Sequence, residues 1–268
     1  MLCAKCPGQW HWWLEHPSPA DFYISRWQSN RSALPLLSLR TIVCLYSVGV
    51  LVATLTVTPR ALGSNAMYWL LYFPHWCFLL IVLTSFFSSA VSAYVYFKKP
   101  IDATFGLPWY VKTYWVLYNV TIPLAFLIST FYWGLLKTSG KMTYYNPHPV
   151  LDVMLHGTNS LVTLVELVMS AHPSRLIHIF QPLLFSLVYL IFNVTYYYAG
   201  GLDPFGHTYI YPVMDWSKPQ EAMVVVALTG VFLSACHLIV VAIATLRDTL
   251  ARRCLKENVG ICNEGFAA

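Results

Sequence analysis

The chain contains a long segment with no charged residue, between Arg60 and Lys98, and this segment excludes most soluble folds. A soluble domain keeps charged side chains on its surface, whereas a helix that spans a bilayer needs about 20 mostly apolar residues. Of the 268 residues, 57% are hydrophobic and only 10% are charged. The composition therefore predicts a polytopic integral membrane protein with no nucleic-acid partner, in spite of the net charge of +5.

The apolar segments predict an all-α bundle of six transmembrane helices. The expected helices lie at about 41–58, 66–97, 113–136, 150–171, 176–198 and 222–246. Residues 1–38 form an aromatic tail that we expect to lie on the membrane. Residues 39–247 then form the transmembrane domain, and residues 248–268 form a basic C-terminal tail.

The distribution of basic residues predicts that both termini lie in the cytosol. Most lysines and arginines lie in the two tails, in the loop that contains Lys98 and Lys99, or just after the last expected helix. Basic residues near the ends of spans are retained on the cytosolic side.

No motif indicates a cofactor or a metal. The only Cys-x-x-Cys pair, Cys3 and Cys6, has no partner spacing typical of a zinc module. The chain contains no P-loop, no GxGxxG and no HExxH. We expect neither a metal site nor a cofactor.

The segment at 150–171 combines an apolar composition with one polar face. Its polar residues occur mostly three or four positions apart and share one side of a helix: His156, Asn159, Ser160, Thr163, Glu166 and Ser170. An ionisable group in hydrocarbon costs about 2.5 kcal/mol or more unless it has a partner or faces water. His156 and Glu166 are therefore expected to face other helices.

The expected topology places the polar residues of several helices at two depths. An outer group would contain His75, His156, Asn159 and Asn193, and an inner group would contain Asn119, Glu166 and His237. Either group could form a hydrolytic or ligand-binding site, or could simply join helices by hydrogen bonds. A protonated Glu166 bonded to Asn119 is one form of the second hypothesis. In the loop after the fifth helix, Asp203, His207 and Asp215 suit either turn chemistry or a binding role.

Several sequence segments resemble the rolling stone family of multipass animal proteins. They are EHPSPADFYISRWQ, YFPHWCFLL, TYWVLYNV, LHGTNSLVTLVEL and YYYAGGLDPFGHTYIYPVMDW. The resemblance covers nearly the whole chain. It implies a role at the plasma membrane rather than in the endoplasmic reticulum, in cell–cell adhesion or in the fusion of myoblasts. The implied partners are membrane lipids and a membrane protein, which could be a second copy of the chain.

The six-helix plan also resembles, more distantly, the androgen-induced membrane hydrolases. That resemblance implies an intramembrane threonine nucleophile with a histidine, and His156 matches the histidine. The expected threonine position falls within residues 68–83, which contain no Thr or Ser, and Cys77 is the only substitute there.

These observations favour a non-enzymatic protein of membrane organisation or cell fusion. One alternative is an intramembrane lipid-ester hydrolase that uses His156. Another is a channel or transporter lined by the polar face with His156, Thr163 and Glu166.

Overall fold

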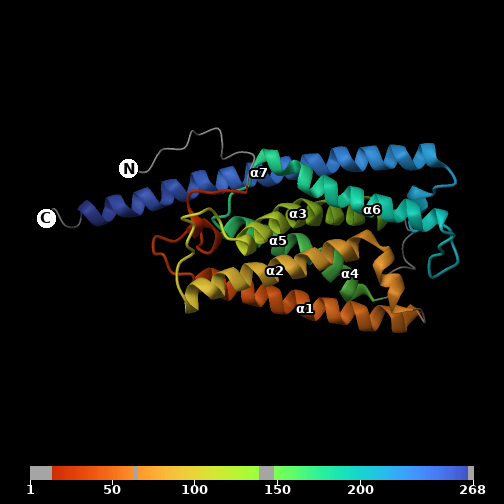
Figure 1. Cartoon of the computed structure of the whole chain (residues 1–268), viewed down its shortest axis with the longest axis horizontal. Helices are drawn as coiled ribbons and strands as arrows, with labels where there is room; N and C mark the ends of the chain where they lie inside the picture. The colour runs from red at the N-terminus through yellow and green to blue at the C-terminus, as the bar shows by residue number, and fades with distance from the viewer. Residues whose placement is uncertain (1–13, 63–64, 139–147, 265–268) are drawn as a thin grey trace.

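The computed structural model describes residues 14–62, 65–138 and 148–264, which form an elongated bundle of α-helices (Figure 1). The helices are α1 (Leu34–Leu62), α2 (Phe73–Phe97), α3 (Trp109–Phe131), α4 (Pro149–His156), α5 (Thr158–Met169), α6 (Phe180–Tyr198) and α7 (Pro219–Glu264). A single antiparallel bridge between Ser25 and Ser170 is the only β pairing in these ranges. The expected all-helical fold is confirmed.

Five helices are long and apolar enough to cross a membrane. These candidate spans are Leu34–Pro59, Phe73–Phe97, Trp109–Gly134, Leu176–Tyr198 and Pro219–Leu255. The expected first and last helices are longer than their apolar centres suggested, since α1 begins at Leu34 and α7 continues beyond Arg247. The segment at 66–97 is interrupted before Pro74, because proline suits the first turn of α2 and cannot continue the helical turn before it.

The fourth expected helix, at 150–171, is divided at Gly157 into α4 and α5. Side chains of other segments stabilise the break. The His156 carbonyl accepts hydrogen bonds from Ser129 Oγ at 2.6 Å and from Trp133 Nε1 at 3.0 Å. The backbone N–H of Ser160 donates to the side chain of Asn159. A broken helix is tolerated at membrane depth where neighbours satisfy the freed backbone groups in this way.

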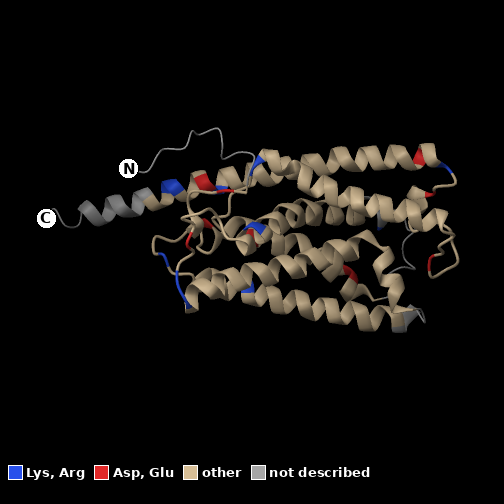
Figure 2. Ribbon diagram, viewed as in Figure 1, with Lys and Arg blue, Asp and Glu red and all other residues tan. Residues whose placement is uncertain are grey.

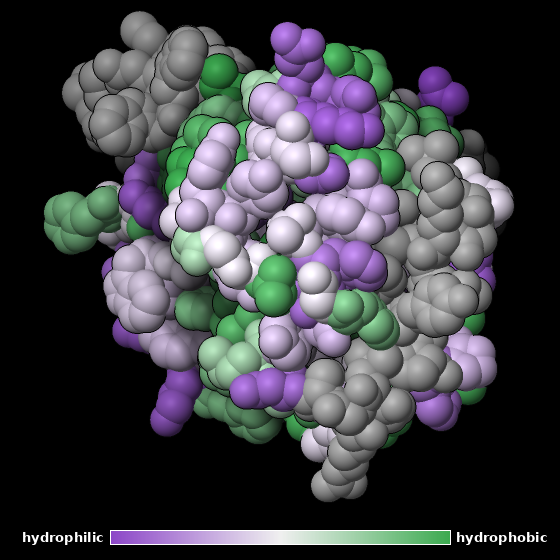
Figure 3. Space-filling model, turned by 90° about the vertical axis from the view of Figure 1, so that its right-hand side faces the viewer, coloured by the Kyte–Doolittle hydropathy of each residue, from purple (hydrophilic) through white to green (hydrophobic). Residues whose placement is uncertain are grey.

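The most buried helix, α3, lies in the middle of the bundle with α5 beside it (Figure 1). Helices α1 and α2 cover one side, and α6 and α7 cover the other. Charged side chains gather at the two ends, and few occur along the middle (Figure 2). The end opposite the chain termini exposes a mixture of polar and apolar side chains (Figure 3).

The segment before α1 packs against the C-terminal end of α5. The last carbonyls of a helix have no partner within the helix. Here Trp27 Nε1 donates to the Val168 carbonyl and Ser25 Oγ to the Met169 carbonyl, each at 2.7 Å. Arg247 Nη1 donates to the carbonyl of Leu167 at 2.8 Å. The described part of the aromatic tail therefore covers the end of the bundle, and its expected contact with the membrane stays a prediction.

Phe22 anchors this segment. Its ring is fully buried and makes edge contacts with Trp115 and His172, with centroid separations of 5.2 and 4.9 Å. Edge-to-face pairs of this kind add to the stabilisation from area burial. The segment is thus held by both hydrogen bonds and core packing.

Replacing Phe22 with Ala should lower the free energy of unfolding by about 3 kcal/mol, because a buried ring is lost and a cavity remains. The measurement is reversible denaturation of the purified protein in detergent. Phe105→Ala is the matched control, since Phe105 is fully exposed. Equal stability of the two variants would show that the segment is not part of the folded core.

Candidate functional site

The polar face expected at 150–171 does face the bundle interior. Asp152, His156, Asn159, Thr163 and Ser170 are all buried. The face holds two charged groups, one near each end. Asp152 and Glu166 are 14 positions apart, which corresponds to about 21 Å along a helix. We call the cluster around Glu166 the inner network and the cluster around Asp152 the outer network.

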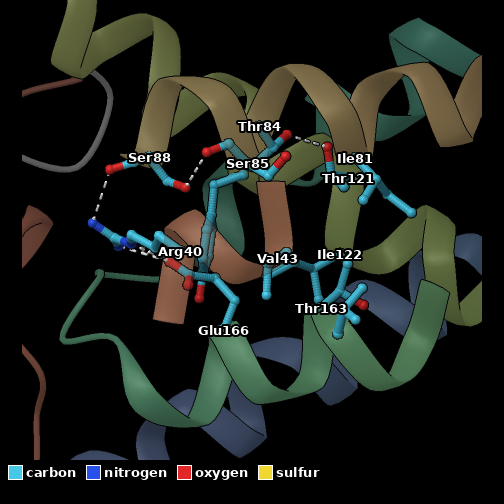
Figure 4. Close-up of a pocket in the computed structure, with 12 residues that line it drawn as sticks. Arg40, Val43, Ile81, Thr84, Ser85, Ser88, Thr121, Ile122, Thr163 and Glu166 are labelled. Atoms are coloured by element: carbon cyan, nitrogen blue, oxygen red, sulfur yellow. Dashed lines mark hydrogen bonds and ion pairs between the residues drawn. The ribbon is translucent and has the colours of Figure 1, made fainter. Parts of the chain in front are cut away.

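The inner network is built on an ion pair between Glu166 and Arg40 of α1 (Figure 4). Arg40 Nη2 and Nε lie 2.7 and 2.9 Å from Glu166 Oε1. The hydroxyl of Tyr114 accepts a hydrogen bond from Arg40 and donates to Glu166 Oε1 at 3.0 Å. The structure therefore joins α1, α3 and α5 through charged and hydroxyl groups.

The remaining donors of Arg40 are also used. Nη1 donates to the Phe22 carbonyl at 2.8 Å and to Ser92 Oγ at 2.7 Å. A guanidinium has five N–H donors, and each has an acceptor here. The side chain of Arg40 is 0% exposed. A buried charge of this kind is tolerated only because it is paired and fully hydrogen-bonded.

Arg40 was the functional residue that the sequence reasoning missed. It lies one residue before the expected helix at 41–58, whereas α1 begins six residues earlier, at Leu34. The available signal was the buried carboxylate of Glu166, which requires a cationic or protonated partner. The expected pairing of Glu166 with Asn119 is not found, because the Asn119 amide contacts His178 Nδ1 and Gln181 Oε1.

A small cavity of about 30 Å³ adjoins the inner network. Figure 4 shows its walls, which include Ser85, Thr84, Thr121 and Thr163. Thr84 and Thr121 hydrogen-bond to each other at 2.7 Å. The cavity has room for a water molecule. It is too small for a lipid or an organic substrate.

The outer network centres on Asp152, whose role the sequence reasoning also missed. Asp152 Oδ1 contacts His156 Nδ1 at 3.1 Å, and Oδ2 accepts from Lys137 Nζ at 2.7 Å. The hydroxyl of Tyr132 bonds to the same carboxylate. The Tyr132 ring is also stacked on His156, with ring centroids 3.7 Å apart. The i, i+4 spacing of Asp152 and His156 was the signal in the sequence.

An aspartate that orients a histidine is part of many hydrolytic sites, but a nucleophile is also needed. In the described ranges, no hydroxyl or thiol is hydrogen-bonded to the His156 ring; Asp152 alone holds it. Cys77 is buried among apolar side chains of α3 and α7. The geometry supports an oriented imidazole without a nucleophile beside it.

The other residues of the expected outer group have separate partners. His75 stacks on Trp69 and contacts its carbonyl through Nδ1. The Asn159 side chain accepts from Ser129 Oγ at 2.8 Å, and Asn193 Oδ1 accepts from Trp216 Nε1 at 2.6 Å. His75 and Asn193 therefore have partners of their own, whereas Asn159 shares Ser129 with the His156 carbonyl.

The loop after α6 uses its predicted residues for turns. Asp203 accepts from the backbone N–H groups of Phe205 and His207 and contacts His207 Nδ1 at 2.9 Å. Asp215 accepts from the N–H of Ser217, just before α7. Gly206 has φ +86°, which favours glycine. These contacts are turn chemistry, and the binding role of the loop stays a prediction.

His172 lies near the inner network, whereas His237 lies beside Arg175. His172 is in the segment between α5 and α6, outside the candidate spans, and is stacked on Tyr118 with centroids 3.8 Å apart. Burial, with the positive charges of Arg40 and Arg247 nearby, holds the pKa of His172 well below its ordinary value. His172 is therefore neutral at physiological pH. His237 contacts the Arg175 carbonyl through Nε2 at 3.1 Å and does not join Glu166.

The Arg40–Glu166 pair gives a non-additive stability prediction. Arg40→Met or Glu166→Leu alone should lower the free energy of unfolding by about 3–5 kcal/mol, since each leaves a buried charge unpaired. The double variant should be more stable than either single variant. A double-mutant cycle from denaturation curves measures this coupling.

The partly exposed pair of Lys112 and Glu15 is the matched control for that cycle. Lys112→Met should cost less than about 1 kcal/mol, because a pair near the surface is solvated in both states. Additive losses at Arg40 and Glu166 would show that the two side chains do not depend on each other.

Two comparisons with known proteins give matches. A family model described as Protein rolling stone matches residues 17–255. The curated Protein rolling stone of Drosophila melanogaster is 30% identical over 224 residues, covering 79% of this chain and 77% of that protein. No solved structure matches the chain.

Proposed function

The chain belongs to the rolling stone family, and we propose that it is a non-enzymatic multipass protein of the plasma membrane that acts in membrane organisation or cell–cell fusion. The fusion setting, with myoblasts as the cell type, is what the resemblance to this family implies. The apolar helices support the membrane assignment. The expected partners, a membrane protein or a second copy of this chain, are part of the proposal.

The non-enzymatic proposal rests on one observation. The polar side chains of residues 150–171 are already bonded to other groups of the protein. Glu166 is paired with Arg40, Asp152 with Lys137 and His156, and Asn159 with Ser129. Groups that are already paired across helices stabilise the bundle, and a reaction or an ion path would need to disrupt those pairs. A channel or transporter along this face would therefore require Glu166 to leave Arg40.

A cytosolic location of both termini fits the arrangement of the chain. The beginning of α1 and the end of α7 lie at the same end of the bundle (Figure 1). Basic residues gather there (Figure 2). Lys98 and Lys99 directly follow α2, and Arg252 lies in the C-terminal part of α7. We propose that α4 and α5 together form a sixth, broken crossing.

One observation favours lipid-ester hydrolysis as a second candidate. The Asp152 carboxylate fixes the ring of His156, which is the arrangement of a general base and its orienting group. For this reaction, a hydroxyl or thiol would have to approach the Nε2 atom of His156 when substrate binds. His156→Asn separates the two functions, because the Asn amide can still donate to Asp152 but cannot act as a base at neutral pH.

The test is a content-mixing assay in cells that lack the endogenous protein and express a restored copy. Wild-type protein and His156→Asn should support equal fusion when their surface amounts are matched, because only the hydrogen bond to Asp152 is needed. A Glu166→Leu variant should lose fusion in proportion to its loss of folded protein.

A fluorophosphonate probe applied to purified protein gives the chemical counterpart. We expect no covalent labelling of wild-type protein in folded preparations. Labelling that disappears in His156→Asn, together with lost fusion in cells, would overturn the non-enzymatic proposal and support the hydrolase. If the protein is present at the surface of wild-type cells but its deletion does not change their fusion, the fusion role itself is contradicted.

A further inference from the structure

A cleft of about 310 Å³ lies between α3, α6 and α7, beside the turn at Pro212–Met214. Aliphatic and aromatic side chains form most of its walls, and the aliphatic ones include Leu127 of α3, Leu187 of α6, and Val226 and Leu233 of α7. No charged side chain is among the described residues that line it. Folded interiors contain few voids larger than a water molecule, so a cavity of this size requires an explanation.

Gly230 keeps the cleft open. It lies inside α7, where glycine is unfavourable compared with any ordinary helix former. A Cβ atom added at Gly230 would meet no atom within 4 Å. Close packing between helices therefore does not explain this glycine. The absence of a side chain at position 230 enlarges the cleft instead.

The hydroxyl groups of Tyr189, Ser186 and Tyr211 in the walls are already bonded to the protein. The hydroxyl of Tyr189 donates to the Leu71 carbonyl at 2.6 Å, and the hydroxyl of Ser186 donates to the Pro182 carbonyl at 2.9 Å. The hydroxyl of Tyr211 accepts from the Phe73 N–H at 2.8 Å. A polar ligand would find few free partners, whereas an apolar ligand would leave every one of these bonds intact.

The cleft is open at its edge, and most of its lining belongs to helices that could cross a membrane. Leu187 and Val213 in its walls are 48% and 52% exposed. The solvent around such helices in a bilayer is hydrocarbon. Along α7 the lining extends from Val225 to Leu233, which is about 12 Å. The shape is thus elongated, and its accessible surroundings are lipid.

We propose that the cleft binds one hydrocarbon chain of a membrane lipid. An apolar cavity of about 150 Å³ in another protein is known to stay dry and to bind benzene, and this cleft is about twice as large. Because the described residues of the walls carry no charged side chain, they favour the hydrocarbon chain of a lipid over its polar headgroup. A fusion protein and a lipid hydrolase could each use such a site, so the inference does not depend on the proposed function.

The experiment uses the full chain in phosphatidylcholine vesicles that contain a small fraction of phosphatidylcholine with a diazirine on one acyl chain. After photolysis, labelled peptides are mapped by mass spectrometry. Leu233 is 1% exposed and lines the cleft, whereas Val231 on the same helix is 70% exposed. Wild-type protein should be labelled at both positions. Labelling of Val231 alone would overturn the proposal.

Gly230→Leu should fill the cleft and remove the label from Leu233 while Val231 is still labelled. The acyl chain enters the cleft from hydrocarbon and not from water, so the loss of the Leu233 label follows from the space that the new side chain occupies. Gly49→Leu is the matched control, since Gly49 lies inside α1, away from the cleft, and also has no atom within 4 Å of an added Cβ.

Two further outcomes would contradict the inference. Equal labelling of Leu233 in Gly230→Leu and Gly49→Leu would show that the label does not enter through the cleft. Crosslinks from a photoreactive residue at Val226 to a second copy of the chain, and not to lipid, would show that a helix of another copy occupies this space. The wild-type label map decides the question even if Gly230→Leu does not fold.

Discussion

The buried pair of Arg40 and Glu166 is the interaction on which the rest of the bundle depends. Two charges in an apolar interior are costly unless geometry and hydrogen bonding compensate for the lost water. Here the compensation comes from α1, α2, α3 and the segment before α1 together. The pair therefore fixes how these elements are placed with respect to α5. The pair contributes more to the selection of one helix arrangement than to the free energy of unfolding.

Donors from several distant segments also meet at the C-terminal end of α5. Three of its last carbonyls accept from Ser25, Trp27 and Arg247, which come from opposite ends of the sequence. Arg247 also donates to the carbonyl of His172, so one guanidinium joins α7 to the whole segment after α5. The end of the bundle near the termini is consequently a closed, hydrogen-bonded surface built from distant parts of the chain.

The sequence was sufficient for the fold class and for most helices, because hydropathy and length decide which segments can cross a bilayer. It also predicted the inward polar face, since His156 and Glu166 could not face lipid. The break at Gly157 was not predictable, because it depends on Ser129 and Trp133 of other segments. The pairing of Arg40 with Glu166 was not predictable either, because a basic residue at the edge of an apolar segment can equally be a topology signal or a buried partner.

The length of α7 has a mechanical consequence. A helix of 46 residues is about 69 Å long, more than twice the roughly 30 Å hydrocarbon core of a bilayer. If one end of α7 sits at the loop with Asp215, its other end stands well clear of the membrane as a continuous rod. A tilt of the membrane-embedded part of α7 would then move its far end, because the helix is continuous. A protein bound at that end would be displaced with it.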